Sequence, residues 1–254
     1  TACENGEGPI KVIEFEDSLV KTICTMYWDK DNDGELSYAE AESVTFIGDV
    51  FSNSDIKSFT ELQYFTNLET ISKTAFDCCE NLTAIIIPDS VTSIGEDAFY
   101  RCTSLTSINI PDGVTEIGRG TFYGCENLKE IIIPDSVITI GKSAFYGCEN
   151  LKEIIIPESV TTIGEYAFEN CTGVESITIG KKVTLIEAKG FRTFSSYFKT
   201  IYCKPATPPT VEAGGIGSGC YEYMTIYVPR ASVSAYKSES YWSSWSSNIV
   251  GYDF

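Results

Sequence analysis

The 254-residue chain carries 36 acidic and 18 basic side chains, which gives a formal net charge of −18 at pH 7. This charge repels phosphate backbones and anionic lipid surfaces, so it argues against nucleic-acid binding and against membrane binding by charge. The chain has no histidine, which excludes Ser-His-Asp catalysis, Cys-His catalysis and histidine zinc sites. Its hydrophobic content of 43% is typical of a folded protein, and its longest aliphatic run, residues 84–87, is too short for a transmembrane helix.

Residues 1–14 are interpreted as a linker. Within them, Thr1-Ala2-Cys3 resembles the end of a bacterial lipoprotein signal, where a small residue precedes the cysteine that is lipidated. The resemblance implies export, with a lipid anchor at Cys3 as the chain's only link to a membrane. An ordinary linker cysteine is the alternative that these three residues leave open.

Residues 15–54 are predicted to form a helix, an acidic loop and a second helix, which together cap the rest of the chain. Asp17 can cap the first helix, and Ser37 and Glu40 have the capping-box spacing at the start of the second. The expected apolar stripe of the first helix consists of Val20, Ile23, Cys24 and Tyr27.

The acidic loop, D-K-D-N-D-G-E-L-S-Y-A-E at residues 29–40, matches the EF-hand pattern at every liganding position. Carboxylates, a backbone carbonyl and a hydroxyl at these spacings supply the oxygen ligands that calcium prefers, and Gly34 stands where the backbone must turn sharply. The predicted calcium ligands are Asp29, Asp31, Asp33, Glu35, Ser37 and Glu40.

This loop resembles the single EF-hand half of dockerin-like segments, and the resemblance implies Ca²⁺ as a structural cofactor. A loop without a second EF-hand is expected to bind calcium weakly, with a dissociation constant of about 10⁻⁴–10⁻³ M, as in extracellular modules. A solvated acidic turn that never holds metal is the alternative.

Residues 55–229 repeat a unit of 23 residues, C-x-x-L-x-x-I-x-I-P-x-x-V-x-x-I-G-x-x-A-F-x-x. Each unit has too few apolar residues for a core of its own, so neighbouring units must stack and bury a continuous one. The repeat therefore predicts a mainly β, right-handed parallel solenoid of leucine-rich-repeat type. Its most regular column is Cys79, Cys102, Cys125, Cys148 and Cys171, which we expect to be buried free thiols that fill space.

The unit resembles the signature of the BspA-like leucine-rich repeat family, most closely over residues 68–185. Members of that family are typically secreted or cell-surface proteins that bind host proteins, other microbes or matrix. The resemblance implies a non-catalytic binding or adhesion module that is secreted or held at the cell surface.

In each I-x-I strand the middle residue must point away from the core. Down the stack these residues form what we call the inner-face column: Ile86, Asn109, Ile132, Ile155, Thr178, Tyr202 and Tyr227. Aliphatic and aromatic side chains open to water on a parallel sheet favour a docking surface for an unidentified extracellular protein or glycan. A β-ladder in which Ile and Tyr simply suit strands is the structural alternative.

Two other functions are alternatives. A passive spacer or display scaffold needs no docking surface. A polysaccharide-acting enzyme needs paired carboxylates, and Glu130 and Glu153 stand one turn apart, near the separation of about 5 Å in retaining glycosidases. Each has a lysine beside it and no cleft is implied, so an enzyme is disfavoured.

Residues 230–254 break the repeat and are interpreted as a C-terminal cap. Residues 231–237 are expected to form a short helix. The aromatic side chains of Tyr241, Trp242 and Trp245 are expected to cover the last apolar layer.

Overall fold

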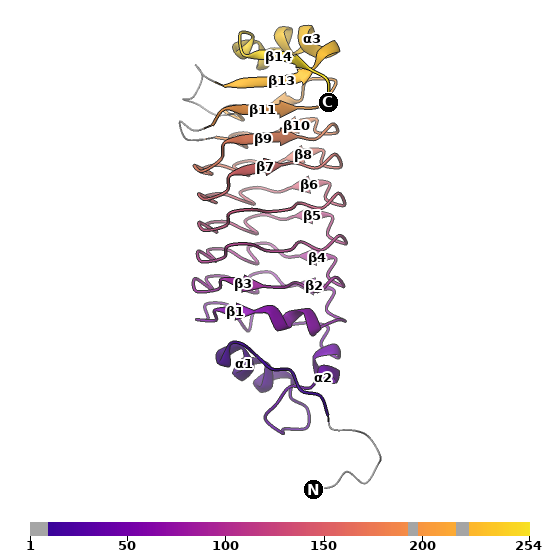
Figure 1. Ribbon diagram of the computed structural model, residues 1–254, viewed down its shortest axis with the longest axis vertical. Helices are drawn as coiled ribbons and strands as arrows, with labels where there is room; N and C mark the ends of the chain where they lie inside the picture. Colours follow the sequence, from indigo (N-terminus) through magenta and orange to yellow (C-terminus); the bar gives the residue numbers. More distant parts are fainter. Residues whose placement is uncertain (1–9, 193–197, 217–223) are drawn as a thin grey trace.

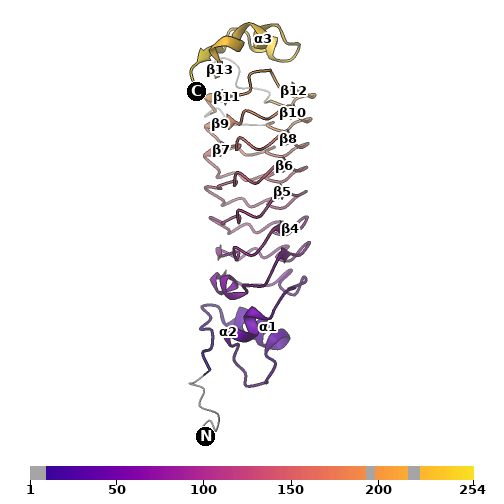
Figure 2. The ribbon, with the colours of Figure 1, turned by 90° about the vertical axis from the view of Figure 1, so that its right-hand side faces the viewer.

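The 23-residue unit of the sequence becomes one turn of a parallel solenoid of about 8 turns, which confirms the predicted fold class. The computed structural model describes residues 10–192, 198–216 and 224–254. The turns stack into a rod that carries helices at both ends (Figures 1 and 2). Cys3, with its predicted lipid anchor, lies outside the described residues.

The strands form two stacks of parallel strands, one on each side of the core (Figure 1), and two turns contribute no strand to the first stack. The first stack contains the I-x-I strands: β1 (Ser58–Phe59), β3 (Ala84–Ile85), β7 (Glu153–Ile155), β9 (Ser176–Ile179), β11 (Thr200–Cys203), β13 (Thr225–Pro229) and β14 (Ile249–Tyr252). The second contains β2 (Thr70–Ile71), β4 (Ser93–Ile94), β5 (Glu116–Ile117), β6 (Thr139–Ile140), β8 (Thr162–Ile163), β10 (Leu185–Ile186) and β12 (Thr210–Val211).

Strand register keeps equivalent residues above one another even where turns differ in length. Ile140 of β6 pairs with Ile163 of β8, one 23-residue step away. The next turns are longer, yet Ile201 of β11 still pairs with Ile177 and with Ile226. The extra residues therefore lie between strands. β14 pairs with β13, so the first stack extends into residues 230–254, the segment that the sequence predicts to be a C-terminal cap.

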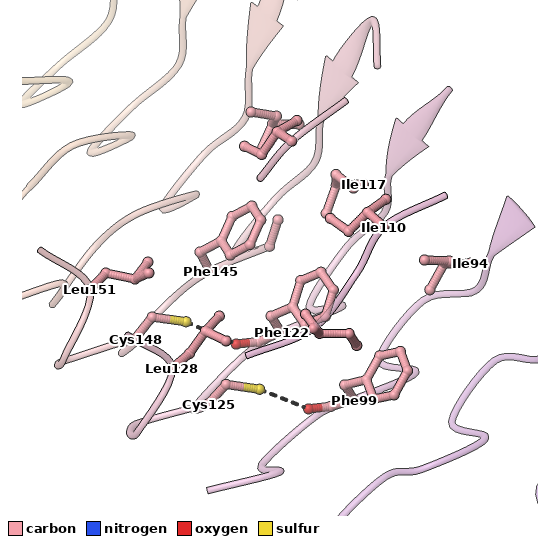
Figure 3. Packing of buried hydrophobic residues seen from close by; sticks show 14 of the residues in the cluster. Ile94, Phe99, Ile110, Ile117, Phe122, Cys125, Leu128, Phe145, Cys148 and Leu151 are labelled. Carbon is pink, nitrogen blue, oxygen red and sulfur yellow. Dashed lines mark hydrogen bonds between the residues drawn. The ribbon is translucent and has the colours of Figure 1, made fainter. Parts of the chain in front are cut away.

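Inside the rod, six successive turns each contribute one phenylalanine ring to a stack. From Phe76 to Phe191 successive ring centroids are 5.0–5.5 Å apart and the planes lie within 16° of parallel. All of these side chains are fully buried. Figure 3 shows Phe99, Phe122 and Phe145 one above another beside the leucine and isoleucine columns.

The cysteine column runs beside the phenylalanine column, and its five thiols are free. Cys125 Sγ donates a hydrogen bond to the carbonyl oxygen of Phe99 at 3.2 Å, and Cys148 Sγ does the same to Phe122 at 3.3 Å (Figure 3). Burial raises the pKa of the Cys125 thiol well above its usual range. The column therefore consists of protonated thiols that fill space and satisfy one backbone acceptor per turn.

The N-terminal cap contains α1 (Ser18–Trp28) and α2 (Tyr38–Glu42), each with its predicted cap residue. Val20 and Cys24 are buried, but Tyr27 is exposed, so the predicted stripe is wrong at its last position. Trp28 lies four residues after Cys24 on the same helix face. Its ring packs against Phe51 and Phe65, with centroid distances of 6.1 and 5.6 Å.

The C-terminal cap covers the last turn with aromatic rings, as the sequence predicts. It contains η2 (Arg230–Ser232), α3 (Val233–Ser238) and η3 (Trp242–Trp245), and a further 3₁₀ helix, η1 (Thr60–Tyr64), lies in the first turn. Tyr236 and Trp242 are fully buried, and the Trp242 indole N–H donates to the carbonyl of Pro209 at 2.9 Å. Across the described part of the chain, no helix has the length and apolarity needed to cross a bilayer.

Each inner ring of the phenylalanine stack packs against two neighbouring rings; Phe145 packs against Phe122 and Phe168. We expect Phe145→Ala to lower the free energy of unfolding by about 3–5 kcal/mol, because the cavity cannot collapse between two fixed rings. Urea denaturation measures this change. The control is Ile138→Ala in the same turn, whose exposed side chain predicts a change within about 0.5 kcal/mol. Equal losses in the two variants would contradict the stacked core.

The burial of the cysteine column predicts which cysteines react with an alkylating reagent. In native protein at mildly alkaline pH, iodoacetamide should leave the five column cysteines unmodified, because they are buried and protonated. Half-buried Cys78, whose pKa burial raises to about 11, should react before them. Urea should make all of them reactive, as peptide mass spectrometry can show. Disulfides within the column would refute the packing role.

Candidate functional site

The inner-face column points outward along the first stack. Ile132 is the most exposed of its aliphatic members at 82%, followed by Ile155 at 54% and Ile86 at 38%. Asn109 is also exposed, while Thr178, Tyr202 and Tyr227 are half-buried. The isoleucines before and after Ile155 in the sequence, Ile154 and Ile156, are buried by contrast.

The C-terminal half of this column lies on one continuous sheet. Ile155 of β7 pairs with Thr178 of β9, and that register continues through Tyr202 of β11 to Tyr227 of β13. The rings of Tyr202 and Tyr227 stack with centroids 5.1 Å apart. The side chains of this half therefore form one ordered row.

The first stack is interrupted between β3 and β7, because residues 106–110 and 129–133 are not in strand conformation. The amide of Asn109 takes the place of ladder bonds there. Its Oδ1 accepts from the backbone N–H of Ile87 at 2.9 Å, and its Nδ2 donates to the carbonyl of Ile87 at 2.8 Å. The sequence offered only one sign of this break, a polar residue at the centre of the I-N-I strand.

A hollow of about 780 Å³ lies over the interruption. Its lining includes three residues of the inner-face column, Ile86, Asn109 and Ile132, together with Ile108 and Ile110. Asp112 and Glu130 also line it, and no lysine or arginine does. The hollow is thus an apolar depression with acidic side chains, on the face where the sequence predicted docking. Glu153 does not line it, so the carboxylates weighed for catalysis do not share this hollow.

The acidic loop brings together three of its six predicted calcium ligands. Carboxylate oxygens of Asp29, Asp31 and Glu40 lie within 4.8 Å of one another. The Asp33 and Glu35 carboxylates are not part of this cluster, although the ligand predicted at Glu35 is its backbone carbonyl, and the Ser37 hydroxyl adjoins the cluster through Glu40. Ser37 Oγ donates to Glu40 Oε2 at 2.8 Å, the Asp33 carboxylate accepts the Glu35 amide at 2.8 Å, and the Glu35 carboxylate pairs with Lys21 at 2.6 Å.

Electrostatic repulsion acts within the three-carboxylate cluster. The amide hydrogen bond from Asp33 lowers the pKa of Asp31, but desolvation and the charges of Asp33, Glu40 and Asp29 outweigh it, so the pKa lies above its usual value. At Glu40, burial raises the pKa, but hydrogen bonds from Ser37 and Lys30 outweigh burial and lower it. Three carboxylates held close together form a donor set that suits a hard divalent cation.

Residues 11–13, which we interpreted as part of a linker, are bound to the exit of the acidic loop. The Ile13 amide donates to the carbonyl of Leu36 at 2.8 Å, and the Tyr38 amide donates to the carbonyl of Lys11 at 3.2 Å. The loop is thereby joined to the segment before α1, and this segment also contacts the first turn of the solenoid. In that segment Glu16 accepts a hydrogen bond from the Ser58 hydroxyl of β1 at 2.8 Å.

Together, the parallel turns, the buried cysteine and phenylalanine columns and the outward I-x-I face define a leucine-rich-repeat solenoid. Residues 69–198 match six copies of the family described as BspA type Leucine rich repeat region. This match covers just over half of the chain, and the chain belongs to that family. No curated protein matches it at a significant level.

Three solved structures resemble the chain. A leucine rich cell surface protein from Faecalibacterium prausnitzii is 34% identical over 63% of this chain and 43% of its own, with a TM-score of 0.54. The Leucine Rich Repeat protein of T. pallidum is 28% identical over 54% of this chain and 67% of its own, with a TM-score of 0.47. A leucine-rich repeat protein from Bacteroides ovatus is 24% identical over 63% of this chain and 59% of its own, with a TM-score of 0.41.

The match therefore spans less than half the length of the Faecalibacterium protein. The family match begins at residue 69, so it does not reach residues 15–54, and the comparisons do not support the resemblance to an EF-hand. That assignment stays a prediction. Leucine-rich-repeat solenoids of this type are typically non-enzymatic surface proteins.

Proposed function

We propose that this protein is a non-catalytic binding or adhesion module, secreted or held at the cell surface, that docks an extracellular protein or glycan on its inner face. The observation that carries the proposal is the exposure of Ile155 and of Ile132, which lines a hollow of about 780 Å³. Removing such apolar surface from water contributes roughly 25 cal/mol per Å², which gives a partner a driving force for binding.

A purely structural ladder accounts less well for this face. Ile155 of β7 pairs with Thr178 of β9, so the ladder accepts a polar residue at the equivalent exposed position and does not require isoleucine there. Where the isoleucine is most exposed, at Ile132, the chain is not in strand conformation at all. Strand propensity therefore gives no reason for an apolar residue at that position.

Placement outside the cell is supported by the Faecalibacterium relative, which is described as a cell surface protein. Lipidation of Cys3 is the proposed route of attachment, with no other contact to the membrane. Neither the proposed docking surface nor the attachment involves nucleic acid.

A structural calcium ion is the second part of the proposal. Asp29, Asp31 and Glu40 would hold it, and the remaining ligands would be Asp33, Glu35 and Ser37. Bound calcium would neutralise the repulsion among the carboxylates and hold the loop closed. Because the loop is bonded to residues 11–13 and α1 packs on Phe51 and Phe65, ordering it would stabilise the N-terminal end of the rod.

The docking proposal predicts that charge on the inner face removes binding. An array of purified extracellular matrix proteins and glycans identifies a ligand for the wild type. The double variant Ile132→Asp plus Ile155→Asp should then weaken that ligand at least roughly 30-fold, because hot-spot losses reach 2 kcal/mol or more. Ile138→Asp is the matched control, since it places the same charge on an exposed isoleucine beside the second stack.

Unchanged binding by the folded double variant would count against the inner face. A wild-type protein that binds nothing on the array would favour the passive spacer. Circular dichroism and thermal unfolding establish that each variant is folded.

The calcium proposal predicts opposite effects of one substitution in two buffers. In chelator, Asp31→Asn should leave stability unchanged or raise it, because it removes like-charge repulsion while keeping an oxygen that can accept the Asp33 amide. In calcium, the wild type should gain about 1.4 kcal/mol at tenfold the dissociation constant, and Asp31→Asn should lose most of that gain. Glu42→Gln, an exposed neighbour outside the cluster, is the control. Thermal unfolding that is insensitive to calcium in the wild type would refute the site.

A further inference from the structure

The residues just beyond the strands of the first stack change charge along the rod. After the prolines that end the I-x-I segments, from Pro88 to Pro157, four successive turns place acidic residues. In order these are Asp89, Asp112, Asp135 and Glu158. At the equivalent position two of the later turns place a cation, Lys181 after Gly180 and Arg230 after Pro229, while the other two have Pro205 and Asp253. This edge of the inner face therefore carries only acids in the four turns from Asp89 to Glu158, and gains cations in the later turns.

A second hollow, of about 760 Å³, lies at this basic end, where the chain terminates beside β11 and β13 (Figure 1). Its lining consists of Lys181, Lys204, Ala206, Pro229, Arg230, Ala231, Tyr252, Asp253 and Phe254. Three cations and one carboxylate thus line it, although the whole chain carries a net charge of −18. Charge complementarity assigns an anionic ligand to this hollow.

Two of the three cations are held in place by carboxylates. Arg230 makes a bidentate pair with Asp253, in which the shortest N–O distance is 2.8 Å. Lys204 Nζ lies 3.1 Å from Glu158, whose other carboxylate oxygen accepts the backbone N–H of Lys181 at 2.8 Å. Within the described residues, the ammonium group of Lys181 itself has no hydrogen-bond or ion-pair partner. It is the cation available to a ligand.

Two aromatic rings supply an apolar wall beside these charges. Tyr252 and Phe254 are 44% and 45% exposed, with ring centroids 5.0 Å apart and planes inclined by 60°. The Tyr252 ring also stands edge-on to Tyr227, with centroids 5.3 Å apart, so it is supported from the sheet. The wall is therefore half open to solvent and positioned before any ligand arrives.

We infer that this hollow binds an acidic saccharide, with a carboxylate on Lys181 and the C–H face of a sugar ring against Tyr252 and Phe254. The volume lies in the range of about 300–1,000 Å³ that is usual for small-molecule sites. Asp253, which lines the hollow, can accept hydrogen bonds from sugar hydroxyls. An acidic peptide could pair with the cations, but its flexible backbone offers no rigid apolar face to the two rings. None of the lining residues belongs to the inner-face column, so this site does not depend on the docking proposal.

The test is to titrate the full chain with a tetrasaccharide of hexuronic acid and to measure binding by isothermal titration calorimetry. We expect saturable binding that weakens as salt is added, because the cations are exposed. Lys181→Glu should weaken binding by roughly tenfold or more, in line with the loss of a charge-assisted hydrogen bond. Lys182→Glu is the matched control, since it makes the same charge change at an exposed neighbour that does not line the hollow.

The aromatic wall is tested separately with Phe254→Ala and Tyr252→Ala. Each should weaken the saccharide while leaving thermal unfolding nearly unchanged, and Phe254→Ala is the cleaner variant because Tyr252 also contacts Tyr227. The Ile132→Asp plus Ile155→Asp variant should bind the saccharide normally. Failure at the hollow is thus distinguishable from failure of the inner-face docking surface.

Several outcomes would overturn the inference. Absence of saturable binding at millimolar saccharide is one, and equal weakening by Lys181→Glu and Lys182→Glu is another, because it would indicate unspecific attraction. Equal affinity for a neutral hexose tetrasaccharide would remove the role of the carboxylate. Equal affinity for a tetraglutamate peptide would reassign the hollow to acidic peptides.

Discussion

Equal turn length is the constraint on which this structure depends. Parallel strands stack about 4.8 Å apart, so a continuous core requires each turn to return every side chain to the same place above its predecessor. The ring spacing of 5.0–5.5 Å along the phenylalanine column shows that the turns meet this requirement. Where a step grows longer, as from Ile177 to Ile201, the strand register is preserved and the connecting segment absorbs the difference.

Stacking in register also distinguishes the buried columns, which are needed for the fold, from the outward columns, whose residues can vary and carry function. A buried column cannot change in one turn without leaving a cavity or a clash against both neighbours, so Phe122 and Cys125 are repeated from turn to turn. The outward columns have no such restriction. The informative residues are therefore those that depart from their column, such as Asn109 among isoleucines, or Lys181 where earlier turns have an acid.

The sequence alone predicted the parallel solenoid, the buried thiols and the aromatic C-terminal cap, because each follows from residues that repeat or that end the repeat. It could not predict features that depend on distances between different turns. The interruption near Asn109 and the first hollow arise from how three turns fit together. Trp28, and not the predicted Tyr27, lies on the packed face of α1, because that is where the helix meets Phe51 and Phe65. At the acidic loop, spacing predicted six ligands, but only tertiary structure shows which three carboxylates converge.

The net charge of −18 disfavours long polyanions but is compatible with a short anionic ligand. Charges act across solvent over a Debye length of about 8 Å at physiological ionic strength. Asp89 and Asp112 lie several stacked turns before Lys181, whereas Glu158 adjoins the cations and is paired with Lys204. A nucleic acid lying along the rod would meet the acidic residues of the early turns and be repelled. A small acidic saccharide at the C-terminal end would meet mainly Lys181, Lys204 and Arg230, with Asp253 as the one carboxylate that lines the hollow. Local charge, set by which residues the register brings together, therefore decides binding at this hollow.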